Sequence, residues 1–153
     1  MAGVFGKLEV EIEVKSNVEN FWGIVKDFPT ISKVIPHYKI IEITEGDGKV
    51  PGSIIKATVD LGSDEKAVVT ERIEGVDDAK RTLTYSVIDG DLLKYVKSYK
   101  GCVSVTPKVD NNGSIVKWSC DYEKASQDAP EPIFIKDFVT KMFSKFDDYL
   151  LSA

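Results

Sequence analysis

The chain has 153 residues, of which 42% are hydrophobic and 29% charged, as in one ordinary soluble globular domain that spans residues 1–153. Its net charge of −5 and the absence of any run of basic residues exclude a protein whose main partner is nucleic acid. The sequence carries no secretory signal pattern and no apolar stretch near the ~20 residues that span a bilayer. We therefore predict a cytoplasmic protein without membrane insertion.

The N-terminal part of the chain predicts one strand followed by two short helices. Residues 8–14 alternate apolar and charged, which indicates a strand with one buried face. Ser16 or Asn17 can cap the helix that follows, and Pro29 limits its length. A second short helix is predicted at Thr30–Val34. The apolar side of the first helix consists of Phe21, Trp22, Ile24 and Val25.

A glycine-rich segment, Glu45–Gly52, resembles a phosphate-binding loop in composition. Such a loop needs a helix directly after it, so that backbone N–H groups converge on the anion. Here the flanking segments, Tyr38–Thr44 and Ser53–Val59, both have strand patterns, and Pro51 lacks an N–H. We therefore expect a strand–turn–strand connection and no bound nucleotide.

Strands dominate the middle of the chain. A turn at Leu61–Glu65 separates Ser53–Asp60 from the next strand, and Asp110–Gly113 has the composition of a hairpin turn. With short connections between them, the segments predict a seven-stranded antiparallel sheet. The later strands are predicted at Lys66–Glu74, Lys80–Ile88, Leu92–Pro107 and Ser114–Lys124.

The pattern changes to helical periodicity after Pro132. Apolar residues recur every three or four positions over about twenty residues, which predicts one long amphipathic helix of about 30 Å. Such a helix would bury its apolar stripe against the concave face of the sheet. The stripe consists of Ile135, Phe138, Val139, Met142, Phe146, Tyr149 and Leu150.

Alternation along three strands predicts which residues face this helix. They are Leu83, Tyr85 and Val87; Tyr95, Lys97, Tyr99, Gly101, Val103 and Val105; and Val116, Trp118, Cys120 and Tyr122. This set is rich in tyrosine and tryptophan, whereas solid cores favour Leu, Ile and Val. Either the tyrosine hydroxyls reach solvent at the sheet edges, or the residues line a cavity suited to an apolar ligand.

The two cysteines and the single histidine match no zinc-binding spacing, and we predict neither a metal nor a cofactor. By alternation, Cys102 and Cys120 face opposite sides of the sheet, so a disulfide between them would need a shift in register. We therefore predict two free thiols.

Several motifs together resemble one plant family. They are residues 6–15 (GKLEVEIEVK), 45–48 with 51–54 (EGDG, PGSI), 85–91 (YSVIDGD), 117–119 with 122–124 (KWS, YEK) and 149–151 (YLL). In this order they resemble the Bet v 1 superfamily, and within it the major latex protein branch rather than pathogenesis-related class 10. The resemblance implies a helix-grip α+β fold, in which a curved sheet and two short helices surround a long C-terminal helix and a large internal cavity.

The resemblance also implies a function. Family members look like carriers or stores of hydrophobic small molecules of the steroid, flavonoid, cytokinin, fatty acid or alkaloid class, and are linked to plant defence and stress. We expect one such ligand as the partner, and a monomer or weak dimer. The ligand-binding residues expected from the inward faces and the resemblance are Phe21, Ile24, Ile55, Ala57, Val59, Val69, Leu83, Tyr85, Lys97, Tyr99, Trp118, Tyr122, Lys136, Phe138, Val139 and Met142.

An enzyme is the alternative, because norcoclaurine synthase and alkaloid isomerases look like relatives that use lysine, carboxylate and tyrosine side chains inside the cavity. The candidates for acid–base chemistry are Lys97, Glu71 and His37. The alternative for Lys97 is that its amine reaches solvent near the cavity mouth. The alternative for His37 is an exposed loop position, since no carboxylate or nucleophile stands next to it in the sequence.

Overall fold

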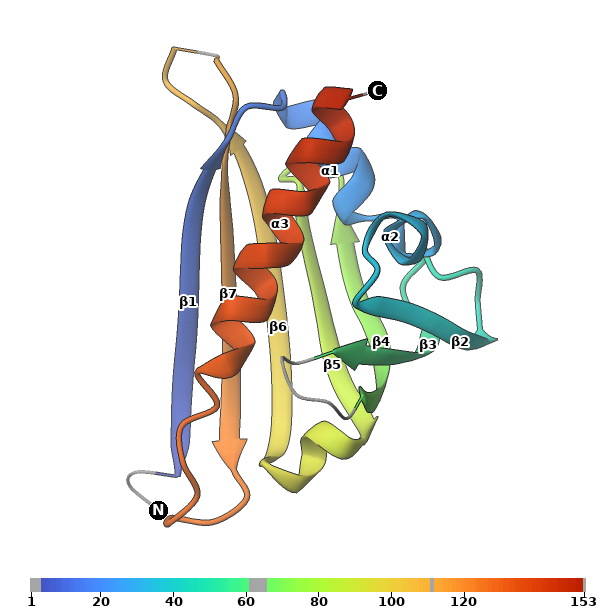
Figure 1. Ribbon diagram of the computed structural model, residues 1–153, viewed down its shortest axis with the longest axis vertical. Coiled ribbons are helices and arrows are strands. Elements are labelled where there is room, and N and C mark those ends of the chain that lie inside the picture. Colours follow the sequence, from blue (N-terminus) through green and yellow to red (C-terminus); the bar gives the residue numbers. More distant parts are fainter. Residues whose placement is uncertain (1–3, 61–65, 111, 153) are drawn as a thin grey trace.

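The computed structural model describes residues 4–60, 66–110 and 112–152, and its α+β fold confirms the helix-grip architecture. One antiparallel sheet of seven strands has the order β1-β7-β6-β5-β4-β3-β2. The sheet curves around helix α3, which crosses its inner face diagonally, while α1 and α2 lie beside the upper part of α3 (Figure 1). The predicted turn at 61–65 and Asn111 of the predicted hairpin lie outside the described residues. The strands are β1 (Phe5–Val14), β2 (Tyr38–Glu45), β3 (Ile54–Asp60), β4 (Lys66–Asp77), β5 (Thr82–Gly90), β6 (Val96–Pro107) and β7 (Ser114–Lys124).

The helices are α1 (Val18–Val25), α2 (Phe28–Val34), a 3-10 turn η1 (Asp91–Lys94) and α3 (Phe134–Ser152). Asn17 caps α1, and its side chain accepts a hydrogen bond from the Asn20 N–H at 2.8 Å. Helix α2 begins two residues earlier than predicted. Asp27 caps it through the N–H and hydroxyl of Thr30, and Pro29 fits in its first turn, where a proline N–H would have no helical partner.

Strand β6 corrects one prediction about which residues face inward. The segment after Gly90 forms η1 instead of strand, and β6 begins at Val96 with an irregular register between Val96 and Ser98. Because one extra residue in a strand reverses the alternation before it, Val96 and Tyr99 are buried while Lys97 is exposed. Tyr95 is also exposed, at 48%. The inward direction predicted for Tyr95 and Lys97 was wrong, whereas that of Tyr99, Gly101, Val103 and Val105 is confirmed.

Helix α3 packs its apolar stripe into the curve of the sheet and against α1. Phe143 and Phe146 lie with ring centroids 6.1 and 6.0 Å from that of Phe21. Just before the start of α1, the Asp147 carboxylate accepts hydrogen bonds from the Lys15 and Ser16 N–H groups and from the Ser16 hydroxyl, all within 3.0 Å. These bonds fasten the C-terminal half of α3 to the connection between β1 and α1. Tyr149, predicted in the stripe, is 45% exposed.

The glycine-rich segment joins β2 to β3, as predicted, and uses its backbone N–H groups internally. The carboxylate of Asp47 accepts from the N–H groups of Lys49 and Val50 at 2.8 and 3.1 Å. The Gly48 N–H donates to the Ser53 hydroxyl, and the Gly52 N–H donates to the Ile73 carbonyl. These N–H groups already have acceptors within the protein, so they do not converge on an anion as in a nucleotide-binding loop.

Both cysteines are free thiols, as predicted, with Cys120 buried and Cys102 partly exposed on the outer face. Among residues 4–60, 66–110 and 112–152, no three His, Cys, Asp or Glu side chains are grouped so as to hold a metal ion. Within the same ranges, no helix is long and apolar enough to cross a membrane.

Candidate ligand-binding cavity

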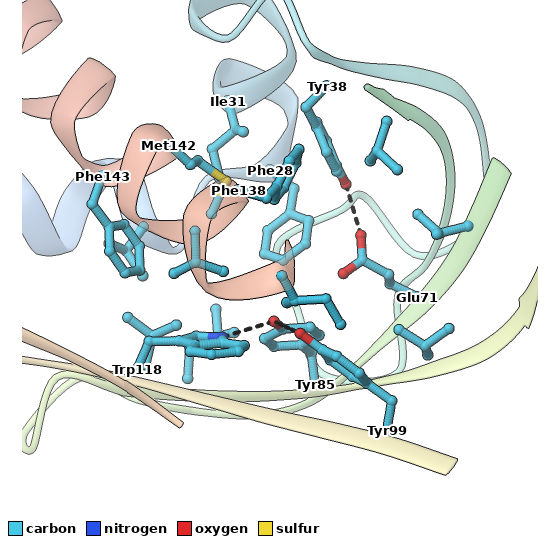
Figure 2. A pocket seen from close by; sticks show the side chains of 18 of the residues that line it. Phe28, Ile31, Tyr38, Glu71, Tyr85, Tyr99, Trp118, Phe138, Met142 and Phe143 are labelled. Carbon is cyan, nitrogen blue, oxygen red and sulfur yellow. Dashed lines mark hydrogen bonds between the residues drawn. The ribbon is translucent and has the colours of Figure 1, made fainter. Parts of the chain in front are cut away.

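An apolar cavity of about 90 Å³ lies between the inner face of the sheet and helices α2 and α3. Figure 2 shows the Trp118, Tyr85 and Tyr99 side chains on the sheet side, the α3 side chains opposite them, and Tyr38 with Glu71 at one end. The lining residues are Val25, Phe28, Ile31, Tyr38, Val59, Val69, Glu71, Leu83, Tyr85, Val87, Leu92, Tyr99, Val103, Trp118, Ile135, Phe138, Val139, Met142, Phe143 and Phe146.

The structure brings together many of the residues proposed from the sequence. Lining residues from that set are Val59, Val69, Leu83, Tyr85, Tyr99, Trp118, Phe138, Val139 and Met142, together with the candidate acid–base residue Glu71. Half of these ten positions lie on β4, β5 and β7, where alternation with a period of two sends every second side chain inward. Whether they contact a ligand is a proposal developed below.

Two lysines in the proposed set lie outside the cavity, which corrects their predicted inward placement. The Lys97 side chain is 62% exposed and its ammonium lies 3.5 Å from the Glu123 carboxylate on the outer surface. The irregular register at the start of β6 turns it outward. Lys136 is exposed because Ile135 and Val139 occupy the inner side of α3, and a residue directly after Ile135 points about 100° away from it.

Five other proposed residues are buried but do not line the cavity: Phe21, Ile24, Ile55, Ala57 and Tyr122. Phe21 fills the contact between α1 and α3. Tyr122 pairs across the sheet with Gly6, where a Cβ would come within 2.4 Å of the tyrosine oxygen. The ring therefore lies over β1 instead of reaching the cavity.

Sequence reasoning did not identify several lining residues, above all Phe28, Ile31, Tyr38, Leu92 and Phe143. Phe143 follows Val139 by four residues, so the helical period was a usable signal for it. Tyr38 begins β2, and alternation from Ile40 would have placed it inward. The positions of Phe28 and Ile31 depend on where α2 docks, and no local pattern indicates that.

Three polar side chains on the sheet side of the cavity form a hydrogen-bonded chain. The Trp118 indole N–H donates to the Tyr85 hydroxyl at 3.1 Å, and the Tyr85 and Tyr99 oxygens lie 3.2 Å apart. Burial raises the pKa of both tyrosines, so both stay neutral. Gly101 makes room for this chain, because a Cβ there would lie 2.4 Å from the Tyr85 ring.

A single carboxyl group faces the cavity at its other end. Glu71 lies on β4 between the inward residues Val69 and Ile73, and its Oε1 accepts a hydrogen bond from the Tyr38 hydroxyl at 3.1 Å. Burial raises the pKa of Glu71 to about 7, and the bond from Tyr38 only partly offsets this. The group therefore exchanges a proton near neutral pH.

His37 lies behind the cavity wall and not in the cavity itself. Its ring meets the cavity-lining Phe138 edge-on, with centroids 5.0 Å apart. Burial, together with the charges of Lys141 and Lys145, lowers its pKa despite the opposing charge of Asp60. Nε2 is buried and has no hydrogen-bond partner among the described residues. His37 lies in the turn between α2 and β2, as the loop alternative predicted, but it is only partly exposed. It borders a separate pocket with Pro36, Lys39, Thr58 and Asp60.

The cavity is smaller than the resemblance led us to expect. Its volume of about 90 Å³ is well below the about 300–1,000 Å³ of sites for drug-sized ligands. Figure 2 shows Phe28, Phe138, Met142 and Phe143 projecting into the space between the helices and the sheet. A larger ligand therefore requires more movement of these side chains than a small one.

Known proteins resemble this chain in sequence and in fold. The chain matches the pathogenesis-related protein Bet v 1 family over residues 3–153. It is 43% identical to MLP-like protein 423 of Arabidopsis thaliana, over 97% of this chain and 96% of that protein. The crystal structure of major latex-like protein 151 from Panax ginseng superposes with a TM-score of 0.86 at 23% identity, over 96% of this chain and 98% of that one.

The fold also occurs in an enzyme. A point mutant of norcoclaurine synthase from Thalictrum flavum, in complex with a transition-state analogue, has a TM-score of 0.74 at 23% identity, over 99% of this chain and 98% of that one. At this identity the likeness concerns the fold alone. The family match, the Arabidopsis relative and the seven-stranded sheet around α3 agree with one another, and this chain is a member of the pathogenesis-related protein Bet v 1 family, in its major latex protein branch.

Proposed function

We propose that this protein binds a hydrophobic small molecule in the cavity between the sheet and α3, and carries or stores it in plant defence, stress or specialised metabolism. The observation that carries the proposal is a cavity with an apolar wall and a few polar groups, which is how small-molecule sites are built. Membership of the Bet v 1 family, a small-ligand-binding fold, supports the same function.

The chain offers a simple reporter for this binding, because it has only two tryptophans. Trp118 lines the cavity, whereas the Trp22 indole N–H donates to Asp78 at 2.9 Å, outside the lining. Titration with 2-naphthylmethanol, followed in ¹H–¹⁵N spectra, is expected to shift the indole resonance of Trp118 and leave that of Trp22 unchanged.

A matched pair of variants tests the location. Val103→Phe places a ring in the cavity, and Ser104→Phe places the same ring on the outer face of the same strand. We expect the first to abolish the Trp118 shift and the second to retain it. No shift in the wild-type protein, or equal binding by both variants, would contradict the proposal. Native mass spectrometry of protein purified from its own tissue would then identify the bound molecule.

A second candidate function is acid–base catalysis, an isomerase or cyclase acting on a plant natural product. Glu71 favours it, because a carboxyl with a pKa of about 7 can both take up and release a proton at neutral pH. Lys97 has no part in this candidate, since its amine lies on the outer surface. The co-purified molecule is the substrate to test. If the wild type converts this molecule and Glu71→Gln binds it without converting it, the protein is an enzyme. If neither protein converts it, the carrier function remains as the proposal.

A further inference from the structure

Glu71 presents a hydrogen-bond acceptor that the described part of the chain leaves unused. Tyr38 donates to Oε1, and among the described residues no hydrogen bond or ion pair reaches Oε2. Figure 2 shows this second oxygen directed away from Tyr38, toward the interior of the cavity. The other polar groups of the lining are Tyr38, which is bound to Glu71, and the mutually bonded Trp118, Tyr85 and Tyr99. The cavity therefore has one unpaired carboxyl oxygen in an apolar wall.

Among residues 4–60, 67–110 and 112–152, no positive charge is found paired with this carboxyl. The titratable groups that face it are Tyr38 from β2, Tyr85 from β5 and Tyr99 from β6, and burial raises the pKa of each so that all three are neutral. The described side chains of α3 that line the cavity are apolar. Because burial already disfavours the charged form of this carboxyl in the folded protein, a cationic ligand group that pairs with it relieves part of that cost.

We propose that the cavity selects a ligand whose apolar body carries one basic nitrogen, which binds Glu71 Oε2 while the body lies between Trp118 and α3. This rests on the proposed binding function and narrows the ligand class. A protonated amine displaces the proton of neutral Glu71 into solvent, and a neutral amine takes that proton directly; either route ends in an ammonium–carboxylate pair. A ligand carboxylate at the same position would face Glu71 with like charge and is rejected above neutral pH.

Three probes with the same two-ring body test this selection: 2-naphthylmethylamine (cation), 2-naphthylmethanol (neutral) and 2-naphthoate (anion). At pH 8, isothermal titration calorimetry of the wild type is expected to give at least tenfold tighter binding of the amine than of the alcohol, and no measurable binding of 2-naphthoate. Glu71→Gln has nearly the same shape and retains an oxygen for Tyr38. It is expected to remove the preference for the amine over the alcohol and to admit 2-naphthoate.

Two further measurements test whether amine binding is linked to loss of the Glu71 proton. The amine affinity of the wild type should fall at least fivefold from pH 8 to pH 5.5, because the proton of Glu71 competes with the ammonium, while the alcohol affinity stays constant. At pH 6, calorimetry in buffers of different ionisation enthalpy should detect proton release on amine binding by the wild type and none by Glu71→Gln.

The outcomes separate this inference from the proposed function. If the alcohol shifts the Trp118 resonance but the amine binds no more tightly than the alcohol, the cavity binds ligands and the inference is wrong. The inference is also wrong if Glu71→Gln keeps the amine preference, since another group would then hold the nitrogen. If none of the three probes binds, the proposed function fails together with the inference.

Discussion

Replacing Glu71 by glutamine should stabilise the protein at neutral and alkaline pH. Glu71 has an ordinary pKa of 4.5 when exposed and about 7 in the folded protein, where burial opposes its charge. The folded state therefore holds the proton more tightly than the unfolded state. By linkage, this group makes the free energy of unfolding fall as the pH rises from 4.5 through 7, and the loss is complete above 7.

The difference between the two pKa values corresponds to a loss of about 3 kcal/mol in the free energy of unfolding once Glu71 is ionised, at 1.36 kcal/mol per pH unit. Glutamine has no charge to bury and can still accept the bond from Tyr38. We expect Glu71→Gln to raise the free energy of unfolding by about 2 to 3 kcal/mol at pH 8. At pH 5 the gain should be under about 1 kcal/mol, because the folded wild type is then protonated.

Urea denaturation at the two pH values, followed by tryptophan fluorescence, measures this difference. The matched control is Glu74→Gln on the same strand, where the partner Arg72 lowers the pKa of an exposed carboxyl. That variant should show no stabilisation at pH 8. An equal effect of Glu71→Gln at pH 8 and pH 5, or a loss of stability at pH 8, would refute a buried carboxyl with a raised pKa.

Four other predictions test the surroundings of the cavity. Gly101→Ala should destabilise the protein by about 1–3 kcal/mol and displace the Trp118 indole resonance, because its Cβ would overlap the Tyr85 ring; an unchanged resonance would contradict that contact. Asp147→Ala should lower the free energy of unfolding, measured by urea denaturation, by about 2–3 kcal/mol, because it removes charge-assisted hydrogen bonds to Lys15 and Ser16. A loss below about 0.5 kcal/mol would show that these bonds do not fasten α3. Lys97→Met should leave 2-naphthylmethanol binding unchanged and stability within about 0.5 kcal/mol, since its ion pair is exposed; a clear loss of binding would place the lysine in the cavity after all. In the folded protein, a thiol reagent such as DTNB should modify Cys102 and not Cys120, whose pKa burial raises to about 12; modification of both at equal rates would argue against the burial of Cys120.

Most of the fold and about half of the candidate site could be predicted from the sequence. Alternation placed Leu83, Tyr85 and Trp118 correctly, because a strand sends successive side chains to opposite faces wherever its pairing is regular. The same reasoning failed at Lys97, where an irregularity in register reverses the faces and no local residue pattern announces it. It also missed Phe28 and Ile31, whose places depend on the docking of α2 against the sheet and α3.

The sequence by itself determined the number and direction of the strands, the long terminal helix and the connecting role of the glycine-rich segment, because these follow from periodicity and turn composition within short windows. Only the tertiary structure decided which inward residues meet around empty space and which fill the core. It also decided the state of Glu71, because a carboxyl's pKa depends on the burial and partners that segments distant in the chain supply. Tyr38 and Glu71 are 33 residues apart in the sequence, and their contact exists only because β2, β3 and β4 pair in one curved sheet.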